Sequence, residues 1–110
     1  MRQQTTELTV DTRGQGLHDC TDAICRWVDG AGIDAGLLTI FIRHTSASLL
    51  IQENASPEVR DDLDAFLDRL APEQPGRYRH EDEGPDDMPA HLKSAVTQVQ
   101  LTIPVAEGSM

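Results

Sequence analysis

The 110-residue chain carries nineteen acidic and nine basic residues and has a formal net charge of −10. This length predicts one domain with a core of its own, and the acidic excess excludes a nucleic-acid partner, because phosphate binding requires a basic patch. The sequence has no apolar run of the ~20 residues that cross a bilayer and no signal-peptide core at its start, which predicts a cytoplasmic protein without a membrane partner.

The first half of the chain predicts a strand, a helix and two further strands. Apolar and polar residues alternate over residues 6–11, which is typical of a half-buried strand. From Leu17 onward apolar residues recur at helical spacing until two glycines end the helix, and its two cysteines, five residues apart, are expected as free thiols. The apolar run 37–42 predicts a buried strand, and residues 47–52 predict a second one.

The second half predicts two helices and a last strand. A hydroxyl at Ser56 and a proline after it are typical of a helix start, and an apolar stripe continues this helix over residues 57–70. Residues 77–87 show no period and predict a loop. A short helix begins at residue 87 or 88 and runs to about residue 96, and residues 100–105 alternate as a strand does.

The predicted order of elements is β-α-β-β-α-α-β. Such an order favours an α+β fold in which a mostly antiparallel sheet is packed with helices. Because no linker, repeat or low-complexity tract interrupts the chain, residues 1–110 are expected to form a single domain. Four strands make a thin sheet for this much apolar surface.

Three histidines stand at or beside the expected ends of elements: His44, His80 and His91. Each alone is more typical of a structural residue than of a ligand: His80 of a solvated loop residue and His91 of a partly buried helix residue, although His44 and His91 both fall where a pocket could form. Together they are the ligand set that zinc or another first-row divalent ion takes in an open, catalytic-type site. Their spacings of 36 and 11 residues correspond to no compact motif, so only the fold can bring them together.

The residues after His44 are Thr45, Ser46, Ala47 and Ser48, and they lie between two apolar runs. Small hydroxylated residues at such a place predict a polar pocket at a strand end, and their hydroxyl and backbone N–H groups suit an anionic oxygen. A serine nucleophile is not indicated, because no GxSxG turn is present and the serines directly follow the histidine. A phosphate-cradling glycine loop before a helix is absent as well.

Five blocks of the sequence carry a resemblance to a known family. They are RHTSAS at 43–48, ENA at 53–55, DL at 62–63, HEDEGPDDMPAHLKS at 80–94 and LTIPV at 101–105. In order and spacing they resemble the YjbQ family, described as secondary thiamine-phosphate synthases. The match runs over nearly the whole chain, and the block at 80–94 is its most specific part.

The resemblance implies a compact α+β fold assembled as a homotrimer, with a histidine-containing polar pocket that holds a divalent metal or an anion. Carried over by position, its motif residues are the three histidines, with Glu53, Asn54 and Asp82 as neighbours. We assign metal binding, to zinc or a similar ion, to His44, His80 and His91. Catalysis is assigned to His44, His91 and Glu53, and cofactor or substrate binding to Thr45, Ser46, Ser48 and Asn54.

The implied activity is that of a transferase. A thiamine-phosphate synthase joins hydroxymethylpyrimidine diphosphate to a thiazole phosphate and releases diphosphate, so the expected partner is a phosphorylated small molecule. Family members continue past the strand that contains Ile103, Pro104 and Val105, so the chain is expected to lack the family's C-terminal strands. The alternatives are a non-catalytic, trimeric module that binds a metal or ligand, and an inactive, truncated family member.

Overall fold

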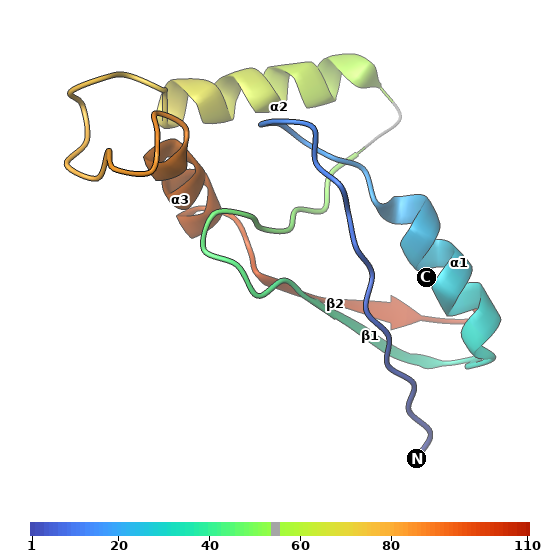
Figure 1. The fold of residues 1–110 in the computed structure, drawn as a ribbon. Helices are drawn as coiled ribbons and strands as arrows, with labels where there is room; N and C mark the ends of the chain where they lie inside the picture. The colour runs from blue at the N-terminus through green and yellow to red at the C-terminus, as the bar shows by residue number, and fades with distance from the viewer. Residues whose placement is uncertain (54–55) are drawn as a thin grey trace. The chain divides into compact units, whose positions relative to one another are not determined.

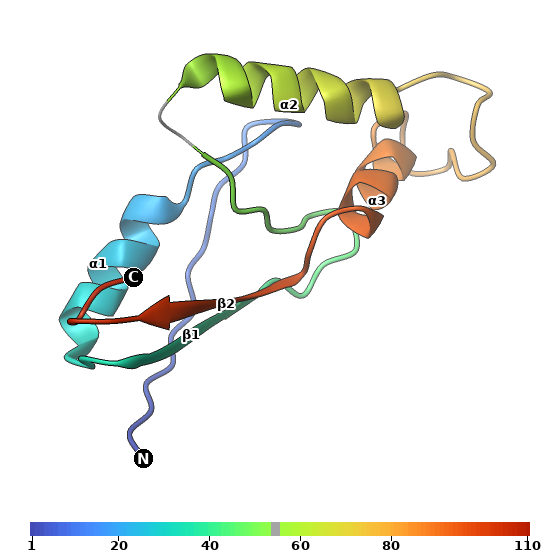
Figure 2. The ribbon, with the colours of Figure 1, turned by 180° about the vertical axis from the view of Figure 1, so that it is seen from behind.

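The computed structural model describes residues 1–53 and 56–110, and Figure 1 and Figure 2 show the course of the chain from opposite sides. The described residues form three helices and two strands. These are α1 (Thr21–Ala31), β1 (Gly36–Phe41), α2 (Pro57–Leu70), α3 (Asp87–Ala95) and β2 (Gln100–Val105). The two strands pair as an antiparallel sheet. The predicted α+β class is therefore confirmed.

Two segments that were expected as strands differ from the prediction. Residues 6–11 form no strand, and Leu8 and Val10 are about half exposed. Within residues 47–52 only Leu49 pairs, through two backbone hydrogen bonds with Gln98 of 2.5 and 3.2 Å. Alternation of apolar residues favours an extended backbone, but a strand forms only where a neighbouring strand supplies hydrogen bonds. In the described chain β1 and β2 supply them only to each other.

The chain divides into two compact units, which we describe separately. The terminal unit comprises residues 1–39 and 102–110, and the central unit comprises residues 40–101. None of the helices in the described residues combines the length and the apolar content that crossing a membrane requires.

Helix α1 belongs to the terminal unit and buries one face, formed by Ile24, Val28 and Ala31. It begins four residues later than its apolar stripe predicts. The carboxylate of Asp19 accepts a hydrogen bond of 2.9 Å from the backbone N–H of Thr21. This local bond satisfies a backbone donor that a longer helix would pair within itself, which is how aspartate favours helix starts over helix interiors. Both cysteines of this region are free, as predicted.

The end of α1 is held by side chains from the start of the chain. Gly32 adopts the left-handed conformation with φ of 69°, which ends the helix without the strain that a Cβ would add. Arg2 donates hydrogen bonds to the carbonyls of Ala31 and Gly32 at 2.8 and 2.9 Å, and Gln4 donates to Ala31 at 2.8 Å. These donors satisfy carbonyl groups that the last helical turn leaves unpaired.

The central unit contains α2 and α3, which form where the sequence predicts them. Pro57 opens α2 after Ser56, and the backbone N–H of Ala71 closes it on the carbonyl of Leu67 at 3.0 Å. Lys93 of α3 donates to Asp68 of α2 at 2.6 Å. The loop that joins the two helices extends beyond the end of α2 in both views (Figure 1, Figure 2). This loop and α3 supply the site described next.

Candidate metal centre

The loop before α3 reverses direction at Gly84, which has φ of 107°. Glycine adopts this backbone at little cost, whereas a Cβ here would also lie 3.1 Å from Oδ1 of Asp86. On α3 itself Asp87 and His91 are four residues apart, and therefore lie on one face of the helix. The turn and the helix together bring loop residues toward that face.

Four side chains meet there: His80, Glu83, Asp87 and His91. One nitrogen or oxygen atom from each lies within 4.8 Å of the corresponding atoms of the other three. We call this group the carboxylate–histidine cluster. Asp87 Oδ2 is its centre, at 2.8 Å from His80 Nε2 and 3.1 Å from His91 Nε2, while Glu83 Oε2 lies 3.4 Å from His80 Nε2. The two imidazole rings meet edge to face with centroids 5.7 Å apart.

Both ring nitrogens of His91 face hydrogen-bond acceptors. Nδ1 donates to the backbone carbonyl of Thr45 at 2.9 Å, because a carbonyl oxygen can only accept. Nε2 faces the Asp87 carboxylate at 3.1 Å. A neutral imidazole has a single N–H, so with Nδ1 as the donor the lone pair of Nε2 points at a carboxylate oxygen. This arrangement requires a positive charge between Nε2 and Oδ2, supplied by a proton or by a metal ion.

Charges in the cluster shift two pKa values in opposite directions. The hydrogen bond that His80 donates to Asp87 raises the pKa of His80 above its ordinary value of 6.5, against a smaller opposing effect of desolvation, and Glu83 adds to the rise. Partial desolvation raises the pKa of Asp87, but hydrogen bonds with His80 and Glu83 and the charges of both histidines outweigh it, so the net pKa is below 3.8. The ionised carboxylate is thus favoured, which suits a metal ligand.

The donor set fits a first-row divalent ion. Two imidazoles with one or two carboxylates are ligands that zinc accepts, and tetrahedral bonds of about 2.0–2.2 Å place neighbouring ligand atoms roughly 3.3 Å apart. The three contacts of 2.8–3.4 Å in the cluster bracket that separation. The hydrogen bond from His91 Nδ1 to the carbonyl of Thr45 would also fix the orientation of the imidazole when its other nitrogen holds a metal.

The structure brings together two of the three histidines that the sequence predicts as ligands. His44 lies outside the carboxylate–histidine cluster. The backbone N–H of Ser46 donates to its Nδ1 at 3.0 Å, and the Ser46 hydroxyl lies 3.1 Å from the same nitrogen. Thr45, between them, reaches the cluster only through its carbonyl on His91. The segment His44–Ser46 therefore contacts the cluster through the backbone carbonyl of Thr45, which accepts from His91.

The remaining predicted site residues that the structure describes also lie outside the cluster. Ser48 donates its hydroxyl proton to Thr97, whose own hydroxyl donates to the carbonyl of Lys93 at 2.8 Å. Glu53 is exposed, and its backbone N–H donates to the side chain of Gln52 at 2.9 Å. Asn54 falls outside the described residues. The catalytic and binding roles given to these residues stay predictions.

Two members of the cluster, Glu83 and Asp87, are not among the residues predicted from the sequence. The signal that identifies Asp87 is its spacing of four residues from His91 within an expected helix, since this spacing places both side chains on one face. Glu83 is one of five acids between residues 81 and 87, and only the turn at Gly84 selects it.

The fold and the cluster define a small α+β protein with a candidate metal site at the start of its third helix. A family model described as UPF0047 protein YjbQ-like matches residues 6–110. The chain belongs to this YjbQ (UPF0047) family.

Two relatives illustrate the match. The UPF0047 protein sll1880 of Synechocystis is 48% identical over 109 residues, which cover 99% of this chain and 74% of that protein. YjbQ of Escherichia coli O157:H7 is 41% identical, over 92% of this chain and 73% of that protein. The solved structure of an uncharacterised YjbQ/UPF0047 protein from Clostridium acetobutylicum superposes with a TM-score of 0.76 at 31% identity, covering 93% of this chain and 75% of that one.

Proposed function

We propose that this chain binds a divalent metal ion, zinc or a similar ion, through His80, Asp87 and His91, with Glu83 as an exchangeable fourth ligand. The observation that carries the proposal is the placement of both His91 nitrogens against acceptors, which favours a cation shared by Nε2 and Asp87. Glu83 is the most exposed of the four side chains, at 66%, and has the longest contact. Three firm ligands and one replaceable position are typical of a catalytic site rather than a structural one.

We further propose that the bound ion serves a transferase acting on a phosphorylated small molecule, with thiamine-phosphate synthesis as the specific reaction. The family resemblance supports the reaction, and the charge of the chain supports the need for a metal. Five acids lie between residues 81 and 87, and a diphosphate beside them requires a compensating cation. When bound, a divalent ion stabilises the charge that develops on a leaving diphosphate.

His44 is assigned to binding the substrate in this proposal. Its Nδ1 accepts a hydrogen bond from the backbone of Ser46, so in the neutral ring the proton is on Nε2. An exposed N–H of this kind is suited to donating a hydrogen bond to a phosphate oxygen of the leaving diphosphate. Glu53, which is exposed, keeps its predicted place among the catalytic residues.

We also propose that the protein assembles as a homotrimer. Large apolar side chains of the central unit remain exposed, which favours their burial against further protein. They include Phe41 (60%), Ile51 (62%), Phe66 (51%), Leu70 (49%) and Val96 (59%). Sedimentation equilibrium measures the assembly directly, and a purely monomeric species at micromolar concentration would contradict it.

Calorimetric titration of the purified chain with Zn²⁺ tests the metal site. We expect one ion per chain in the parent protein and a loss of affinity of at least about 100-fold in His91→Ala, because removing a ligand costs more than the roughly 10–100-fold lost when only a residue bonded to a ligand is changed. His18→Ala is the matched control, since His18 contacts the carbonyl of Gly14, at 2.9 Å, and is not a member of the cluster. Equal affinities in all three proteins would contradict the proposal.

Rescue of a thiamine-auxotrophic strain separates the catalytic from the non-catalytic alternative. We expect the parent chain to restore growth and His44→Ala and His91→Ala to abolish it. Failure of the parent chain to rescue, together with intact zinc binding, would favour a metal-binding module or an inactive family member over an enzyme.

A further inference from the structure

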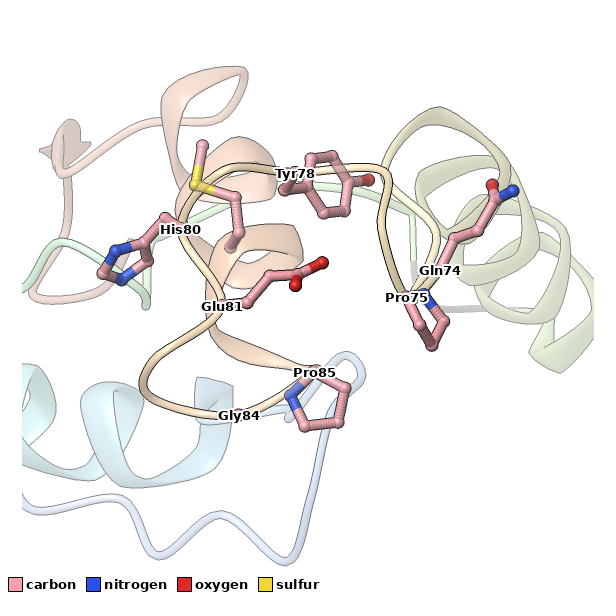
Figure 3. Close-up of a pocket in the computed structure, with 8 residues that line it drawn as sticks. Gln74, Pro75, Tyr78, His80, Glu81, Gly84 and Pro85 are labelled. Carbon is pink, nitrogen blue, oxygen red and sulfur yellow. The ribbon is translucent and has the colours of Figure 1, made fainter.

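A cavity of about 190 Å³ adjoins the carboxylate–histidine cluster. Residues of the loop between α2 and α3 form most of its wall, and Met88 of α3 contributes the rest (Figure 3). His80 lines this cavity and also belongs to the cluster. A molecule in the cavity therefore lies beside the proposed metal site.

The size and surface of the cavity suit a single ring. A cavity of about 150 Å³ holds a benzene molecule in another protein, so 190 Å³ accommodates one ring with a short substituent. Pro75, Pro85 and Met88 supply apolar surface, and the Tyr78 ring is fixed by a hydrogen bond of 2.8 Å from its hydroxyl to the carbonyl of Pro72. Rigid apolar walls of this kind favour a flat, apolar group.

The charge of the lining selects against an anion. Glu81 is the one carboxylate among the lining residues, and none of them is a lysine or an arginine. Its Oε1 accepts a hydrogen bond of 2.7 Å from the backbone N–H of Gly76, which orients the carboxylate. Arg77 lies 5.9 Å over the Tyr78 ring and donates to Gln74, but it is not part of the wall. A positively charged group beside Glu81 therefore meets a counter-charge, whereas among the lining residues an anion meets a cationic group only at His80, next to the proposed metal site.

We propose that this cavity binds the ring of a small organic ligand that carries an amino or amidino cation, with Glu81 as its counter-charge. This proposal rests on the proposed function. The ring is the organic part of the substrate, and the phosphate of the same substrate lies at the metal. Glu81 thus binds the cationic part of the substrate, and the metal binds its phosphate.

Three probes of similar size and different charge test the selectivity: benzylamine, benzyl alcohol and benzoate. Binding is followed by NMR from the ring signals of Tyr78, the single tyrosine of the chain, and from the methyl group of Met88, with and without Zn²⁺. We expect benzylamine to bind about fivefold more tightly than benzyl alcohol, which is the upper effect of one exposed charge pair, and benzoate to bind weakest.

Two variants separate charge from shape. Glu81→Gln keeps an oxygen that can accept from Gly76, and we expect it to abolish the difference between amine and alcohol. Glu73→Gln removes a neighbouring acid that does not line the cavity, and we expect it to keep the difference. Benzoate binding as tightly as benzylamine, unshifted Tyr78 signals with every probe, or unchanged selectivity in Glu81→Gln would overturn the inference. Zinc titration of the same samples reports on the metal site separately, so the two proposals fail independently.

Discussion

The carboxylate–histidine cluster and the segment from His44 to Ser48 contain similar residues but satisfy them in different ways. His44 bonds within its own turn, to the backbone and hydroxyl of Ser46. His80 and His91 instead face a carboxylate, because Asp87 and His91 share a helix face and the turn at Gly84 folds the loop toward it. A histidine is therefore a candidate ligand where its ring nitrogen faces a carboxylate, because a cation shared by the two groups is then favoured.

The largest expected effect is that of Asp87→Asn on metal binding. Asp87 contacts both histidines, so replacing its charge removes a ligand and the attraction between the ion and the carboxylate. We expect the affinity for Zn²⁺ in calorimetry to fall by at least about 100-fold. Glu83→Gln is the comparison, with an expected loss of about tenfold, because Glu83 is more exposed and more distant. An effect of Glu83→Gln as large as that of Asp87→Asn would mean that the ion is held differently.

The next effect is that of Gly84→Ala, which tests the turn that builds the cluster. A Cβ at φ of 107° strains the backbone of the turn, and it lies 3.1 Å from Asp86 Oδ1, so the Asp86 side chain must also move by a few tenths of an ångström. Backbone strain of about 1–3 kcal/mol at such a position predicts a loss of about tenfold in Zn²⁺ affinity. Gly76→Ala is the control. Gly76 also has a positive φ, of 81°, but it is not next to a cluster residue in the chain, whereas Gly84 directly follows Glu83. Equal losses in both variants would point to general loop strain.

The titration of His80 is a moderate effect and is measured by NMR on the metal-free protein. Its pKa is expected above 6.5 and is expected to fall toward 6.5 in Asp87→Asn. A raised folded pKa contributes stability below pH 6.5 that is lost as the pH rises through the folded value. The lowered pKa of Asp87 contributes stability above pH 3.8 that is lost as the pH falls through its folded value.

Because protons compete with metal for His80, zinc affinity is expected to rise with pH through the raised pKa of His80. A pKa of His80 at its ordinary value, unchanged by Asp87→Asn, would contradict the contact between the two side chains.

The smallest expected effect on metal binding is that of Ser46→Ala. Removing this hydroxyl deletes one of the two contacts of His44 Nδ1 and leaves the cluster intact. We expect Zn²⁺ affinity to change less than twofold, while the ¹⁵N shifts of His44 report a change in tautomer populations. A large loss of zinc affinity in this variant would make His44 a ligand, as the sequence analysis predicts, and would remove the contrast between the two regions.

Much of the fold was predictable because its signals are local. The stripe over residues 57–70 and the start after Ser56 predict α2, and the alternation over residues 100–105 predicts β2. The same local signals predict strands at 6–11 and 47–52, where the described structure has none. Alternation reports only that a backbone is suited to be a strand, whereas pairing depends on which segments come into register.

The sequence alone determined the helices of the central unit, the acidic net charge of −10, and the choice of His80 and His91 as candidate ligands. Tertiary structure decided which carboxylates join them, because a turn at Gly84 selects Glu83 among several acids. It also decided which ring nitrogen of His91 carries a proton, because Nδ1 donates to the carbonyl of Thr45, 46 residues away. Helical spacing is encoded within a few residues, but a contact across 46 residues exists only after the chain has closed that loop.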